Sequence, residues 1–384
     1  MIQKLMHQYK KQNNERVLLF NKNSSEIDSL HGLRSISILL IIWLHLYIPA
    51  GPFLNVPYSW LDRLFRNFTS GVDLFFILSG FLIYGKLRST SNLNRQSVKV
   101  YFEKRVRRIL PAYYVALIGS AIFLIDLSQS LQAFQAELLN QVHRSLSNWW
   151  ADVFLVSNYV ADRLLDLGWS LSLEAHFYIT VPLFVYLIQK ARLSRIVPLV
   201  MLVLLYFVPL GFRFIQIDNN MTYFYTHTRI DSIIAGMVVS EIYYLGWLTK
   251  LSNFKSICLL IVSVLLLVIA HVSEIDSFFY RTVRYNFFNV GFSGLLVLSL
   301  CSPMIQRPLS IAPFRFLARI SYTMYLWHPL LITIVIRQFY IDVKAINLSQ
   351  IFLIWLFGFC ITIAISTLLY LLVEKRFQYS AKSH

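Results

Sequence analysis

Charged residues and cysteines are both scarce in this chain. Asp, Glu, Lys and Arg make up 14% of its 384 residues, whereas soluble domains carry about 25%. Hydrophobic residues make up 57%, and long apolar segments recur along the whole length. A soluble globular domain is therefore excluded, and the composition predicts an all-α membrane protein with several spans.

The three cysteines, Cys258, Cys301 and Cys360, lie within or at the end of apolar runs and have no paired spacing. Neither a disulfide framework nor a zinc site is indicated. The sequence also lacks a glycine-rich phosphate loop, a nucleophile elbow and a zinc-protease helix. We therefore expect no metal, and we expect chemistry carried by side chains of the apolar segments.

Acidic residues are few as well, with 19 Asp and Glu against 35 Lys and Arg and a formal net charge of +16. An excess of this size is compatible with nucleic-acid binding. The basic residues fall between the apolar runs, however, and a membrane topology explains that placement better. No nucleic-acid partner is expected.

Ten apolar segments predict a bundle of about ten transmembrane helices. Because the number is even, both termini lie on one side, and 25 of the 35 Lys and Arg fall on that side. The positive-inside rule places both termini in the cytoplasm. The predicted segments are 33–52, 71–87, 109–127, 170–189, 195–214, 228–248, 255–272, 285–302, 319–340 and 350–373.

Arg34 and His45 stand at the two ends of the first apolar run. Eleven steps along an α-helix return to nearly the same face, roughly 16 Å further along the axis. Ionisable side chains inside membrane segments are costly and usually face a cavity, a partner or a path. The alternative is that Arg34 is a positive-inside flank and His45 an interhelical contact.

Arg105 and Arg108 end a basic connection just before the third segment. Three residues apart, they share a helix face and form a plausible fork for phosphate groups. Ordinary anchoring to anionic lipid is the competing interpretation.

Five more polar side chains fall within predicted spans. Glu174 is the strongest site candidate, because a carboxylate in a membrane needs a cation or a hydrogen-bond donor. Ser79 belongs to a Ser-Gly step that permits close helix approach. Asp73 suits a helix cap or a local pair, whereas Arg229 and Asp231 point different ways and each need a partner on another helix.

In the ninth segment Ser321, Tyr325 and His328 follow one helix face. We favour a structural or cavity-lining role for these three side chains. The His328-Pro329 step is expected at a distortion of the helix.

Taken together, the ordered pieces resemble the bacterial acyltransferase-3 family of integral-membrane acyltransferases, over roughly residues 26 to 377. Many members have Asp-Gly-Leu-Arg where this chain has His31-Gly32-Leu33-Arg34, so the orientation of the arginine by that acid does not carry over. The stretches that carry the resemblance are 34–45, 71–81, the pair at 105 and 108, 169–178 and 321–328.

The resemblance implies transfer of an acyl group, usually acetyl from acetyl-CoA, at the bacterial cytoplasmic (inner) membrane. The acceptor would be a hydroxyl of a cell-surface polysaccharide, such as lipopolysaccharide O-antigen, capsule or exopolysaccharide. In a compatible mechanism, Arg34, Arg105 and Arg108 hold the phosphates of the donor. His45 exchanges the proton, since histidine has an unperturbed pKa near 6.5, and Glu174 or a hydroxyl orients it. Direct transfer and an acyl-histidine relay both stay open.

We expect a cytoplasmic N-terminal arm at 1–26, an acyltransferase-3-like transmembrane domain at 27–377, a short cytoplasmic tail at 378–384 and no fused extracytoplasmic domain. The expected partners are membrane lipid, a polysaccharide or lipid-linked glycan acceptor, and a separate extracytoplasmic acyl-handling protein. A secondary transporter or polysaccharide-export protein is the main rival, although no inverted repeat supports it. A structural subunit with charges that only fix helix pairing is the other.

Overall fold

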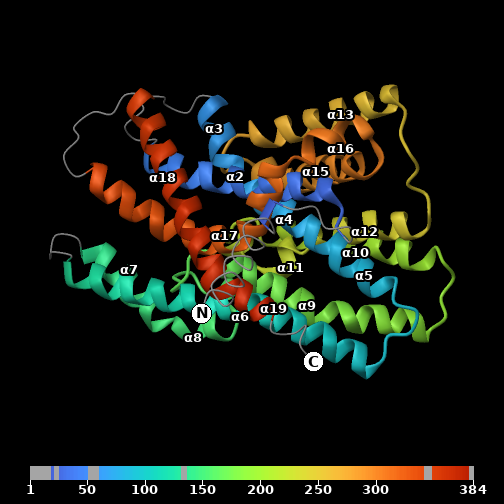
Figure 1. The fold of residues 1–384 in the computed structure, drawn as a ribbon, viewed down its shortest axis with the longest axis horizontal. Coiled ribbons are helices and arrows are strands. Elements are labelled where there is room, and N and C mark those ends of the chain that lie inside the picture. The colour runs from blue at the N-terminus through green and yellow to red at the C-terminus, as the bar shows by residue number, and fades with distance from the viewer. Residues whose placement is uncertain (1–18, 21–25, 51–59, 131–135, 341–347, 380–384) are drawn as a thin grey trace, which may run out of the picture.

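The structure is a computed structural model that describes residues 19–20, 26–50, 60–130, 136–340 and 348–379. Throughout these ranges every regular element is a helix, so the predicted all-α class is confirmed (Figure 1). Helices α13, α15 and α16 lie along one edge of Figure 1, and α6, α7 and α8 along the opposite edge, with α4 between them.

Nine helices of fourteen residues or more form the framework within the described residues. They are α2 (Asp28–Ala50), α6 (Arg95–Ser130), α9 (Gly168–Lys190), α10 (Val197–Ile215), α12 (Asp231–Tyr244), α13 (Asn253–His271), α15 (Arg284–Cys301), α17 (Ala312–Tyr340) and α18 (Leu348–Leu369). The shorter elements are α3 (Trp60–Arg66), η2 (Asn67–Ser70), α4 (Gly71–Ser79), η3 (Gly80–Tyr84), α5 (Gly85–Arg88), α7 (Ala136–Ser147), α8 (Trp149–Val153), η5 (Ser157–Tyr159), η6 (Asn220–Tyr223), α11 (Thr226–Arg229), α14 (Phe278–Arg281), α16 (Pro303–Leu309), η7 (Tyr370–Glu374) and α19 (Lys375–Tyr379).

In the part of the chain that the structure describes, seven stretches of helix are long and apolar enough to cross a membrane, and an eighth joins α15 to α16 if that pair, bent by 96°, is one span. The two remaining predicted segments correspond to α12, which is fourteen residues long, and to α17. Helix α12 is shorter than the predicted segment 228–248 because the helix is interrupted at Ile230, between α11 and α12. The count of ten and the cytoplasmic termini stay predictions.

The stretch at 60–88, which includes α4, is the most enclosed span. Inside the protein 67% of its apolar window is buried, against 22% for α10 and 22% for α13. The exposed apolar side chains of α10 and α13, such as Ile215 and Phe254, suit contact with lipid. Helix α4 therefore lies in the interior, where its polar residues must find protein partners.

Helices α4 and α12 cross with their backbones in close contact, as the Ser79-Gly80 step predicted. A β-carbon added to Gly80 would lie 2.0 Å from the carbonyl oxygen of Ile233, and one added to Gly236 would lie 2.0 Å from that of Ile77. The π-helical turn η3 begins at this crossing, and such turns are frequent at functional sites. Only glycine fits at either position.

Substitution of Gly236 by alanine should destabilise the fold by about 1–3 kcal/mol, because the new methyl group meets a backbone atom that cannot rotate away. Thermal unfolding in detergent measures the effect. Gly211→Ala in α10 is the matched control, since no atom lies within 4 Å of the added carbon. Equal unfolding temperatures for the two variants would contradict the tight crossing.

Candidate functional site

One cavity of about 150 Å³ collects most of the side chains that the sequence singled out. Residues from α2, α4, η3, α6, α9 and α17 surround it. The predicted residues among them are Arg34, Ser79, Arg105, Arg108, Glu174, Ser321 and Tyr325. These helices are far apart in sequence, so the fold brings polar and charged side chains together in a cavity that apolar side chains also line.

Three arginines bring positive charge to this cavity. Arg34 comes from α2, and Arg105 and Arg108 come from α6, so their predicted shared face is confirmed. Within the described residues, none of the three guanidinium groups has a hydrogen bond or an ion pair. Arg105 lies over the rings of Tyr101 and Tyr178, 5.8 and 5.6 Å from their centroids. The N–H donors are therefore available to an anion.

The arginine pair lies on a continuous helix because α6 begins well before the predicted segment. At its start the backbone N–H of Ser97 donates to Asn94 Oδ1 at 2.9 Å, and that of Asn94 donates to Ser97 Oγ at 3.2 Å. Such reciprocal capping satisfies backbone donors at a helix N-terminus. Residues 105 and 108 thus lie on regular helix, one turn apart.

Glu174 faces the same cavity and is held by two hydroxyl groups. Ser79 Oγ donates to Oε1 at 2.5 Å, and Tyr178 Oη, four residues along α9, donates to Oε2 at 2.8 Å. Both carboxylate oxygens are thus engaged, and neither contacts an imidazole. Of the two groups expected to orient His45, Glu174 or a hydroxyl, Glu174 makes no hydrogen bond to His45 here and lies instead beside the three arginines.

His45 does not line the cavity and instead packs against His328. The Nδ1 of His45 is 3.3 Å from His328 Nε2, and the ring centroids are 4.7 Å apart. Tyr325 connects this pair to the cavity: its ring centroid is 6.0 Å from that of His328, and its hydroxyl is 2.6 Å from Ser170 Oγ. Polar groups thus run from the cavity toward the histidine pair.

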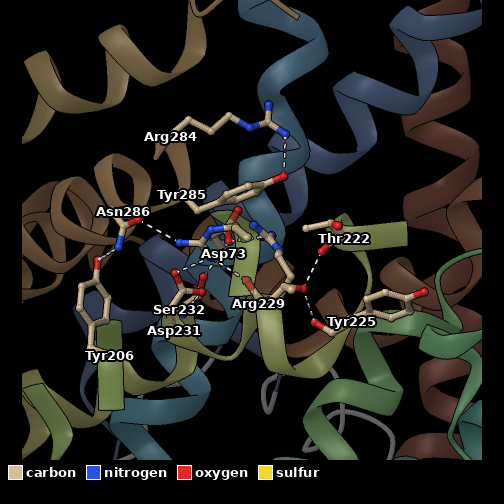
Figure 2. A network of polar contacts seen from close by, with 12 residues as sticks. Asp73, Tyr206, Thr222, Tyr225, Arg229, Asp231, Ser232, Arg284, Tyr285 and Asn286 are labelled. Atoms are coloured by element: carbon tan, nitrogen blue, oxygen red, sulfur yellow. Dashed lines mark hydrogen bonds and ion pairs between the residues drawn. The ribbon is translucent and has the colours of Figure 1, made fainter. Parts of the chain in front are cut away.

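Asp73, Arg229 and Asp231 belong to a separate buried network (Figure 2). Arg229 Nη2 donates to Asp73 Oδ1 at 2.8 Å, and Arg213 Nη1 donates to Asp231 Oδ2 at 2.9 Å. The prediction that Arg229 and Asp231 find partners on other elements is confirmed. Asp73 is not a local cap, because its cation is 156 residues away.

Sequence reasoning missed two members of that network. Arg213 and Arg284 lie at the ends of apolar runs, where a residue facing water is expected, yet their exposed fractions are 0% and 2%. In Figure 2 the ring of Tyr285 lies between Arg284 and the Asp73–Arg229 pair, and Tyr285 Oη accepts from Arg284 Nη2 at 3.1 Å. Their position at the ends of apolar runs was the only signal in the sequence.

No group of three or more His, Cys, Asp and Glu side chains that could hold a metal occurs in the described ranges. The anion-binding capacity of the arginines is the chemical feature that distinguishes the cavity.

Comparison with known proteins gives a consistent result. Residues 27–371 match the family model Acyl_transf_3, described as an acyltransferase domain. Among curated proteins, the chain is 27% identical over 79% of its length to "O-acetyltransferase OatA" of Staphylococcus aureus and to "Putative peptidoglycan O-acetyltransferase YrhL" of Bacillus subtilis. It is also 27% identical over 80% of its length to "Peptidoglycan O-acetyltransferase OatA" of Listeria monocytogenes.

The chain spans about half the length of these relatives: the aligned part covers 50% of the Staphylococcus aureus and Listeria monocytogenes proteins and 48% of the Bacillus subtilis protein. No solved structure matches the chain significantly.

Proposed function

The chain belongs to the acyltransferase-3 family, and from that premise we propose that it is a membrane O-acyltransferase moving acetyl from acetyl-CoA to a hydroxyl of a cell-envelope polysaccharide. The observation that carries the proposal is the cavity in which Arg34, Arg105 and Arg108 form no ion pair or hydrogen bond within the described residues, although the Glu174 carboxylate lines the same cavity. Charge-assisted hydrogen bonds from guanidinium groups bind phosphates strongly and with defined geometry.

The cavity supports donor binding better than lipid anchoring. Side chains that only anchor a helix to anionic lipid point outward to the headgroups. Here the arginines of two helices line the same cavity. An elongated donor with its phosphates at this space would extend its thioester past Ser170 and Tyr325 toward the histidine pair.

In the proposed reaction, the acceptor hydroxyl oxygen attacks the thioester carbonyl, a C–O bond forms and the C–S bond breaks. His45 takes the hydroxyl proton and returns it to the departing thiolate, so atoms and charges balance without a metal or redox step. An acyl-histidine relay is the alternative route, with the same proton acceptor acting as nucleophile.

For the acceptor, the names of two relatives favour peptidoglycan. We propose peptidoglycan as the first acceptor to examine, with lipopolysaccharide O-antigen, capsule and exopolysaccharide as alternatives. The acetyl group goes directly to the glycan or to a separate extracytoplasmic protein that completes the transfer.

Mass spectrometry of the envelope polysaccharides from cells with and without the protein tests the proposal. We expect a mass gain of acetyl size, removed by mild base, in one polysaccharide only when the protein is present. Equal masses in every fraction, with the protein present in the membrane, would overturn the proposal in favour of the transporter alternative.

Replacement of both Arg105 and Arg108 by alanine should raise the donor KM by about 10²–10⁴-fold, because each of the two lost charge-assisted hydrogen bonds costs about 1.5–3 kcal/mol. Initial rates at varied acetyl-CoA concentration measure it. Arg107→Ala is the matched control, since this neighbour on α6 is exposed and does not line the cavity. An unchanged KM in the double variant would mean that the pair only anchors the helix.

A further inference from the structure

The hydrogen bonds around His45 and His328 define the tautomer of each ring. His45 Nδ1 is 2.8 Å from the carbonyl oxygen of Ile41, and His328 Nδ1 is 3.0 Å from that of Met324. A carbonyl oxygen only accepts, so in both rings Nδ1 carries the hydrogen. The tautomers follow from these partners and leave the Nε2 of both neutral rings with a lone pair.

The hydrogen bond between the rings can then run only from His45 to His328. His328 Nε2 is 3.3 Å from His45 Nδ1, so the N–H of His45 is shared between Ile41 and His328. A protonated His328 would direct an N–H at another N–H, which disfavours that state. His328 is fully buried, and it acts as a neutral acceptor behind His45.

We propose that His328 is a positioning residue for His45: its Nε2 accepts from His45 Nδ1 together with the carbonyl oxygen of Ile41, and these two acceptors hold His45 in the tautomer with Nε2 free to take the acceptor's proton. This inference rests on the proposed function. No hydrogen bond to His45 Nε2 occurs among the described residues, so that lone pair is available.

The same contact supports the charged intermediate state. When His45 takes a proton on Nε2 it becomes an imidazolium, and its Nδ1–H becomes a stronger donor to the lone pair of His328. In serine hydrolases a buried carboxylate behind the histidine has this role. Here a neutral imidazole in an apolar bundle replaces it, which avoids a buried unpaired anion while His45 is neutral.

Carboxylates on helices packed near α2 are engaged elsewhere. Asp62 of α3 accepts from Arg66 at 2.9 Å, and Asp73 of α4 accepts from Arg229 at 2.8 Å. His328 of α17 is the titratable side chain with a described contact to His45.

The test compares His328→Leu, which removes the acceptor, with His328→Gln, which can present an amide oxygen at the position of Nε2. For His328→Leu we expect kcat to fall at least about tenfold, with the donor KM within twofold of wild type. The acidic limb of its pH–rate profile should move to lower pH, because the imidazolium has lost its partner. His328→Gln should restore most of kcat and of the acidic limb.

A purely structural role would lower the amount of folded protein equally for both variants and leave the pH profile in place, which would overturn the inference. A second readout does not need acyl transfer: the pH dependence of His45 carbethoxylation by diethyl pyrocarbonate, read by peptide mass spectrometry on the purified full chain. Its midpoint should move to lower pH in His328→Leu only. If the wild type transfers no acyl group, the proposed function fails, whereas an unmoved midpoint refutes the role of His328.

Discussion

Replacement of His45 by alanine should remove the acylated polysaccharide while leaving the protein in the membrane. Proton transfer by a positioned histidine contributes about 10²–10⁴-fold to a rate, so the remaining product should fall below detection by mass spectrometry. Either route proposed above, direct transfer or an acyl-histidine relay, requires this imidazole. The loss should appear in kcat, since the arginines that bind the donor are untouched.

His176→Ala is the matched control for that variant. His176 is also a half-buried histidine on a membrane helix, but its Nδ1 contacts Thr226 Oγ1 at 2.7 Å and it does not line the cavity. Its replacement should leave the acylated product within about twofold of wild type, as substitutions away from key features usually have small effects. Product retained in His45→Ala would remove His45 from the mechanism.

Local spacing predicted those parts of the site that one helix presents. Arg105 and Arg108 share a face because helical periodicity decides it, and the structure confirms their common cavity. The Ser79-Gly80 step predicted a close crossing because glycine has no β-carbon. The backbone of another helix can therefore approach closely, whichever helix that is. Such features depend on few residues and survive errors of several residues in the helix ends.

Contacts between distant segments were not predictable in the same way. His45 and His328 are 283 residues apart, and nothing in either segment specifies that α2 packs against α17. Glu174 was one of two kinds of group expected to orient His45, the other being a hydroxyl, yet Ser79 and Tyr178 bond to both of its oxygens. Partner choice depends on how helices pack, which hydropathy does not encode.

The charges at the ends of apolar runs show the same limit. Arg213 and Arg284 have the sequence context of residues that flank a span in water, and the structure buries both. A guanidinium can lie inside a bundle when carboxylates, amides and aromatic faces surround it. Arg284 has such an environment, with Tyr280 and Tyr285 at its faces.

Replacement of Arg229 by methionine should be among the most destabilising single changes in the chain, at about 3–5 kcal/mol, because it leaves the Asp73 carboxylate buried without its cation. The side chains of the pair are 0% and 2% exposed, and the only other described donor to Asp73 is the hydroxyl of Ser232, at 2.7 Å. The change is measured by unfolding the full chain in mixed micelles that contain increasing fractions of a denaturing detergent. Arg144→Met is the control, since Arg144 is 51% exposed and surface ion pairs contribute little.

A double variant separates an uncompensated charge from lost packing. In Asp73→Asn with Arg229→Met, both charges are absent, so the penalty for burying a lone carboxylate disappears. The double variant should therefore be more stable than Arg229→Met alone, by a coupling of about 0.5–3 kcal/mol. If it is equally unstable or worse, the Arg229 side chain acts through its contacts with the rings of Tyr223 and Tyr285. The network in Figure 2 would then stabilise the fold by packing around a cation, with the ion pair secondary.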